Sequence, residues 1–185
     1  MNEISFRTAR PSDIDNIMLL ECACFNEMTQ ESKSIYLERI EQFPHGFLIL
    51  EYKGRFAGAI SSEIWTRSSE ISAEVFALGH SITQQEISGD ELYISSMGIL
   101  PEYNRKGYGN ILFRKLIGSI LKDFGNIQYG ILIVNERWTG AYRIYRKNGF
   151  CDSGRIQAFF KEDDGSYSDG IIMRHDNIRD VFRTQ

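Results

Sequence analysis

The sequence predicts an α/β fold in which helices flank a mixed, mostly antiparallel sheet with one parallel pair of strands at its centre. Three observations predict it. The 185 residues are 42 % hydrophobic and 25 % charged, which suits one domain over residues 1–185 with its own core. Short apolar segments joined by glycine-containing turns are typical of hairpins. A strand, a long helix and another strand follow one another in the middle, and such a crossover joins parallel strands.

The chain begins with a predicted strand at residues 4–9. Ser12 and Asp15 have the spacing of a capping box, so a first helix is expected to start there. Apolar residues at helical spacing predict a second helix over residues 33–43, and Pro44 ends it. The first strand is therefore expected to be followed by two helices.

A hairpin follows, with strands at residues 47–51 and 56–64 and a turn at Lys53 and Gly54. Residues 67–89 are polar and irregular, with a short helix expected around residues 72–77. We interpret this segment as an insertion over one face. It either borders a substrate site or forms a surface loop.

The central crossover consists of a strand at residues 91–99, a helix at 108–124 and a strand at 129–134. The helix carries a broad apolar stripe, as expected when one side is buried. A further amphipathic helix after Trp138 ends at Gly149, and residues 155–174 form a last hairpin. A ligand crevice is expected where the parallel strands end.

Charge and cysteine content exclude several classes. The net charge is −4, from 21 basic and 25 acidic residues, which argues against a nucleic-acid partner. Three cysteines are too few and odd for a disulfide framework and favour reduced thiols in the cytoplasm. The three histidines lack metal-ligand spacing, so no metal is expected. Without a long apolar segment or signal peptide, we expect no membrane partner.

The most informative segment spans residues 97–110, where a strand end leads through Pro101 into a helix start. Unpaired N–H groups in the first helical turn bind anions, and Gly107 and Gly109 let a phosphate approach the backbone. Arg105 and Lys106 add positive charge. The alternative is that the two glycines only cap a helix.

This segment resembles the acetyl-coenzyme A motif of the GNAT superfamily of N-acetyltransferases. Residues 141–150, which end in Asn148-Gly149-Phe150, are similar to a second motif of that family. Asn104 stands where the family usually has Arg or Gln, and Trp138 stands where Asn is common. The resemblance implies the GNAT fold, in which the central parallel strands splay apart to admit the coenzyme arm.

The resemblance also implies acetyl-coenzyme A as cosubstrate, an acyltransferase activity and the primary amine of a small molecule as acceptor, acetylated by direct attack. Asn135 is expected to replace the polar contact that Trp138 cannot make. The expected coenzyme-binding residues are Met97, Gly98, Ile99, Asn104, Arg105, Lys106, Gly107, Tyr108, Gly109, Asn110 and Asn135.

Three residues are predicted to carry the chemistry. Tyr145 matches the family tyrosine near the coenzyme sulfur, which implies that it protonates the leaving thiolate, unless it only fills the core. Strand alternation places Glu91, Tyr93 and Ser95 on one face, so Glu91 could act as base through water relayed by Ser95. Glu91 could equally be a solvated strand end. Glu21 on the first helix could meet a cationic substrate.

The layout is also similar to the arylalkylamine N-acetyltransferase branch, but Tyr93 and Ser95 stand where that branch has two histidines. Two other functions stay open: a protein or peptide N-acetyltransferase, and an acetyl-coenzyme A-binding module without catalysis. The chain is expected to be a monomer or homodimer.

Overall fold

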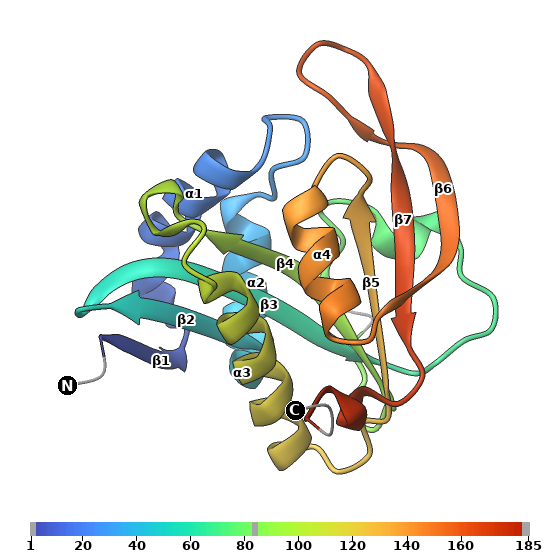
Figure 1. Cartoon of the computed structure of the whole chain (residues 1–185), viewed down its shortest axis with the longest axis horizontal. Helices are drawn as coiled ribbons and strands as arrows, with labels where there is room; N and C mark the ends of the chain where they lie inside the picture. The colour runs from blue at the N-terminus through green and yellow to red at the C-terminus, as the bar shows by residue number, and fades with distance from the viewer. Residues whose placement is uncertain (1–2, 83–84, 183–185) are drawn as a thin grey trace.

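The computed structural model describes residues 3–82 and 85–182. In this part of the chain, seven strands form one sheet in the order β1-β2-β3-β4-β5-β7-β6 (Figure 1). The strands are β1 (Ile4–Thr8), β2 (Phe47–Tyr52), β3 (Arg55–Trp65), β4 (Glu91–Ile99), β5 (Tyr129–Asn135), β6 (Cys151–Lys161) and β7 (Tyr167–His175). The α-helices are α1 (Ile14–Cys24), α2 (Lys33–Gln42), α3 (Tyr108–Asp123) and α4 (Thr139–Lys147). None of the described helices is long and apolar enough to cross a membrane.

The sheet is mixed, as the sequence predicts. The neighbours β4 and β5 are parallel, and the remaining neighbouring pairs are antiparallel. The parallel ladder pairs Glu91–Ile94 only with Tyr129–Leu132, whereas β5 stays paired with β7 as far as Asn135. From Ser95 onward, β4 therefore diverges from β5, and a gap opens at their carboxyl ends.

Helices cover both faces of the sheet (Figure 1). The apolar stripe of α3, including Leu112, Leu116 and Ile120, packs with β2, β3 and β4 in the largest core cluster. On the opposite face, α1 and α2 pack against β2 and β3 around Ile17 and Tyr36. The insertion between β3 and β4 is anchored there too, because Phe76 is 2 % exposed beside Trp65 and Tyr93.

The first helix begins differently from the prediction. Pro11–Asp13 form a 3₁₀ turn, and α1 starts at Ile14. The Asp13 carboxylate accepts the backbone N–H of Arg10 at 2.8 Å and two bonds from the Arg7 guanidinium. The prediction of Ser12 as the cap is therefore wrong: Asp13 occupies the N-cap position of α1 without a side-chain cap bond, because its carboxylate is held by Arg10 and Arg7 in the preceding turn. Gly149 ends α4 with a φ of +87°, as predicted.

A β-bulge interrupts β4 beside the gap. Ser61 of β3 lies opposite Ser96, but its neighbour Ser62 lies opposite Ile94, which leaves Ser95 as an extra residue. A bulge breaks the two-residue alternation of a strand. The predicted common face of Glu91, Tyr93 and Ser95 is therefore interrupted at Ser95, and two consecutive serines border the gap.

Candidate active site

The loop between β4 and α3 forms a cradle of backbone N–H groups. It contains a 3₁₀ turn at Pro101–Tyr103, and Gly107 then caps α3 with φ +79° and ψ 2°. Gly107 has no side chain with which to cap α3, so within the described part of the chain the N–H groups of the first helical turn are available to an anion. An added Cβ at Gly107 would meet nothing within 4 Å, which leaves this backbone open to a large ligand.

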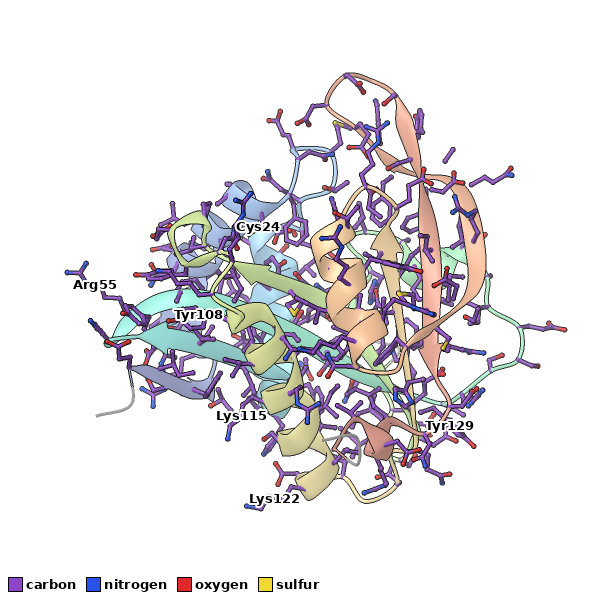
Figure 2. All side chains as sticks on the ribbon, viewed as in Figure 1. Cys24, Arg55, Tyr108, Lys115, Lys122 and Tyr129 are labelled. Carbon is purple, nitrogen blue, oxygen red and sulfur yellow. The ribbon has the colours of Figure 1, made fainter. Side chains whose placement is uncertain are left out.

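A cavity follows this loop from the end of β4 to α4, and we call it the loop cavity. Tyr108, labelled in Figure 2, marks the start of α3 at its edge. All of the predicted coenzyme residues line this cavity except Lys106 and Asn135. The Lys106 ammonium group instead donates to the carbonyl of Glu102 at 3.2 Å. Asn135 is fully buried and donates to the Glu162 carboxylate at 2.9 Å.

Sequence reasoning missed four residues of the loop cavity, namely Tyr103, Gly140, Ala141 and Ile144. Three of them come from α4 and one from the 3₁₀ turn. The similarity of residues 141–150 to a family motif was the signal for the α4 wall. The cavity combines an open N–H cradle, the guanidinium of Arg105 and an apolar channel, which is the chemistry that a diphosphate carrying a long neutral arm requires.

A second cavity, the inner cavity, begins where the strands diverge. It shares Met97 and Ala141 with the loop cavity, so the two meet at the gap. Ser95, Ser96 and Tyr145 border it, and Glu21 and Glu31 supply carboxylates. Its aromatic walls are Phe25, Phe76, Tyr93, Trp138, Phe159 and Phe160.

Tyr145 lies in this wall with 7 % of its surface exposed. Its ring packs against Phe113, with centroids 5.3 Å apart, and against Phe150 at 6.3 Å. Its hydroxyl makes no hydrogen bond within the described residues, and burial raises the pKa of the phenol. The group is therefore protonated at neutral pH and free to donate into the cavity.

Glu91 lies elsewhere. It borders a different cavity beside Trp65, and the Nε atom of Arg174 is 3.3 Å from its Oε1 atom. Burial raises its pKa, although Arg174 and Arg67 oppose the shift. Ser95 is four positions further along β4, about 13 Å away along an extended strand. Ser95 instead contacts Ser61, with the two Oγ atoms 2.7 Å apart, so the structure does not bring Glu91 and Ser95 together.

A cluster of buried charged residues that the sequence did not predict lies at the wall of the inner cavity formed by Glu31 and His80. Glu31 accepts Arg39 at 3.1 Å and the backbone N–H of Gly79 at 2.7 Å. His80 Nε2 lies 3.0 Å from Glu63 Oε1, and both belong to the wall between β3 and the insertion. Desolvation lowers the pKa of His80, but the Glu63 carboxylate and the Ala77 carbonyl together outweigh it and raise the pKa. The only signal for this cluster was Arg39, which sits on the apolar side of its helix.

Aromatic and polar contacts bridge the outer edge of the inner cavity. The ring of Trp138, before α4, lies 5.2 Å from Phe25 and 5.1 Å from Phe160. Beside them, Asn26 donates to Glu162 at 3.0 Å. The segment after α1 is thereby joined to the β6–β7 hairpin across the gap, and the inner cavity is enclosed on that side.

Cys24 does not have the properties of a nucleophile. Cys24, at the end of α1 (Figure 2), lies 3.4 Å from the carbonyl of Ile99, and burial raises its pKa to about 11. Such a thiol is not ionised at neutral pH. Cys22, Cys24 and Cys151 are all free. The described residues contain no group of three or more side chains that could hold a metal ion.

Comparison with known proteins identifies the fold and family. The model of the acetyltransferase (GNAT) family matches residues 14–150, a range that contains all the residues that line the loop cavity. The chain belongs to the GNAT family. It is therefore an acetyl-coenzyme A-dependent acyltransferase, and the loop cavity is where the residues fit the coenzyme. A search of curated proteins found no match.

Solved GNAT structures agree with this architecture. The loading GNATL domain of CurA from Lyngbya majuscula superposes with a TM-score of 0.79 at 16 % identity, over 96 % of this chain and 99 % of that one. The ribosomal-protein-S18-alanine N-acetyltransferase from Escherichia coli gives 0.68 at 17 % identity, over 92 % of both chains. The putative acetyltransferase yncA from Salmonella typhimurium, solved with acetyl-CoA, superposes with a TM-score of 0.67 at 18 % identity, over 95 % of this chain and 94 % of that one. These similarities establish the fold; the acceptor must come from the site.

Proposed function

We propose that this GNAT protein transfers the acetyl group of acetyl-coenzyme A to the primary amine of a small molecule with an apolar body. The observation that carries the proposal is the inner cavity, which is bridged along its outer edge and meets the loop cavity at Met97 and Ala141. Its aromatic walls suit an apolar or aromatic body, and the carboxylates of Glu21 and Glu31 suit a cationic amine.

Enclosure favours a small acceptor over a peptide. An extended peptide needs an open groove so that its chain can leave the site on both sides. Here the Phe25–Trp138–Phe160 contacts and the Asn26–Glu162 bond span the outer edge. A peptide would have to break these contacts, whereas a small amine can be held behind them.

In the proposed reaction the neutral amine attacks the thioester carbonyl, a C–N bond forms and the C–S bond breaks. A backbone N–H group of β4 at Met97 or Gly98, beyond the end of the parallel ladder, is proposed to stabilise the negative oxygen. Tyr145 is proposed to donate its proton to the leaving thiolate, whose ordinary pKa is about 8.5. The nitrogen, positively charged after its attack, loses one proton as the amide forms, and this proton restores the Tyr145 hydroxyl. The position of Tyr145 in the wall of the inner cavity, with no hydrogen bond from its hydroxyl to another described residue, supports this role.

The test is to incubate the purified protein with acetyl-coenzyme A and separate panels of arylalkylamines, polyamines, aminoglycosides and peptides, and to measure thiol release and product mass. We expect turnover with small amines of apolar body. Turnover with peptides alone would overturn the proposal and show that the acceptor is a peptide. Tight coenzyme binding without transfer to any amine would show a binding module. We also propose that the protein works in the cytoplasm, which its free thiols support.

A further inference from the structure

A short chain of hydroxyl groups connects Ser96 to the buried carboxylate of Glu21, and both residues belong to the wall of the inner cavity. The Tyr36 hydroxyl lies 2.6 Å from Glu21 Oε2 and 3.2 Å from Ser96 Oγ. Ser96 borders the inner cavity beside Met97, where the thioester is proposed to lie. Tyr36 is 2 % exposed and Glu21 is 3 % exposed, so the chain is shielded from bulk water.

We propose that Glu21 is the final proton acceptor for the attacking amine and that Ser96 and Tyr36 relay the proton to it. This proposal rests on the amine-acetylation function above. The ammonium group of the acceptor gives one proton to Ser96 Oγ, the Ser96 proton passes to the Tyr36 oxygen, and the Tyr36 proton passes to Glu21 Oε2. The amine is left neutral, each hydroxyl is restored, and the carboxylate becomes a carboxylic acid that later releases its proton to water.

The geometry fixes the direction of the relay. A phenol has one proton, and the 2.6 Å contact to the carboxylate is the shorter and stronger of its two. The Tyr36 proton therefore lies toward Glu21, and the Ser96 hydroxyl donates to the Tyr36 oxygen. Glu21 Oε1 is already occupied by the backbone N–H of Glu31 at 2.7 Å, which leaves Oε2 as the end of the chain.

The surroundings make Glu21 a stronger base than an exposed glutamate. Burial raises its pKa, and the charge of Glu31 adds to the increase, although the Tyr36 bond and Arg39 act in the opposite direction. Tyr36 stays protonated because burial and the neighbouring Glu21 raise its pKa well above the ordinary value. The titratable or polar groups that face Glu21 are Cys24 from α1, Glu31 from the following loop, Tyr36 and Arg39 from α2, and Ser96 from β4.

The experiment compares two acceptors in the full-length protein, an alkyl amine with a pKa of about 10.4 and an amine of similar shape with a pKa of about 7. For Glu21→Gln we expect kcat/KM at pH 7 to fall about 100-fold or more with the first amine. With the second amine, kcat/KM should fall only about tenfold or less, because about half of this amine is already neutral at pH 7. The acid limb of the wild-type pH profile should disappear, and coenzyme affinity should stay the same.

Tyr36→Phe should reproduce this pattern by breaking the relay while keeping Glu21, and it carries the test alone if Glu21→Gln does not fold. Ser62→Ala is the matched control, because it removes a buried β3 hydroxyl that donates to Gly46 and borders neither cavity. It should not change the ratio between the two amines. Equal losses for both amines, or an unchanged acid limb in Glu21→Gln, would overturn the relay alone. A wild-type protein that binds coenzyme but acetylates no amine would overturn the proposed function and the relay with it.

Discussion

Gly107→Glu gives the sharpest test of the coenzyme site, because a matched position separates binding from stability. Gly107 has a φ of +79° and Gly165, in the β6–β7 turn, has a φ of +80°; an added Cβ meets nothing within 4 Å at either. A left-handed conformation costs a non-glycine residue about 1–2 kcal/mol. Each substitution should therefore lower Tm by about 2–8 °C in a chain of this size.

The effect on coenzyme binding should differ between the two variants. A carboxylate about 5 Å from one phosphate charge, at an effective dielectric constant of about 20, costs about 3 kcal/mol. This weakens binding about 100-fold, since about 1.4 kcal/mol is tenfold. Titration calorimetry with acetyl-coenzyme A should show the loss for Gly107→Glu and none for Gly165→Glu. Equal affinity of the wild type and Gly107→Glu would refute the assignment of the diphosphate to the start of α3.

Three further predictions follow from the same contacts. Tyr145→Phe should lower kcat about 100-fold, as measured by thiol release, while Tm and coenzyme affinity change little, because the hydroxyl has no partner within the described residues; an unchanged kcat would exclude Tyr145 as the proton donor. The pKa of His80 is raised in the folded state, so its protonation stabilises the fold fully below about pH 6.5, and this stability is lost as the pH rises through the folded pKa. Urea unfolding should therefore show a larger loss for His80→Gln at pH 6 than at pH 9, and a loss independent of pH would contradict the Glu63 pairing. Asn26→Ala removes the 3.0 Å bond to Glu162 and should raise kcat/KM for bulky amines relative to small ones; no change in this ratio would argue that the bond does not restrict the cavity.

Local signals in the sequence predict much of the fold. Periodicity identifies α3 and the central crossover, and the turn at Lys53 and Gly54 joins β2 to β3 as expected. The loop at residues 97–110 predicts most of the loop cavity, because a helix start and its glycines are local in sequence. These features depend on neighbours within a few residues, so a single sequence contains them.

Other features depend on distant residues and left no local pattern. The bulge at Ser95 arises from its register with β3, and strand alternation could not foresee it. Asn135 finds its partner outside the loop cavity because Glu162, 27 residues away in the sequence, lies beside it in the folded chain. The contact of Tyr36 with Glu21 joins residues 15 apart, and its contact with Ser96 joins residues 60 apart. Such a cluster becomes visible only when the helices are placed on the sheet.

The short parallel ladder divides the sheet into two halves that share little backbone pairing. Within the described residues, the strand pairing between the β1–β4 half of the sheet and the half formed by β5, β7 and β6 is limited to Glu91–Ile94 and Tyr129–Leu132. The loop cavity is lined by residues from both halves, since Met97 belongs to β4 and Ala141 belongs to α4, which follows β5 in the chain. A molecule bound in the loop cavity contacts both halves of the sheet. Its binding free energy therefore adds to the free energy of unfolding of the whole domain.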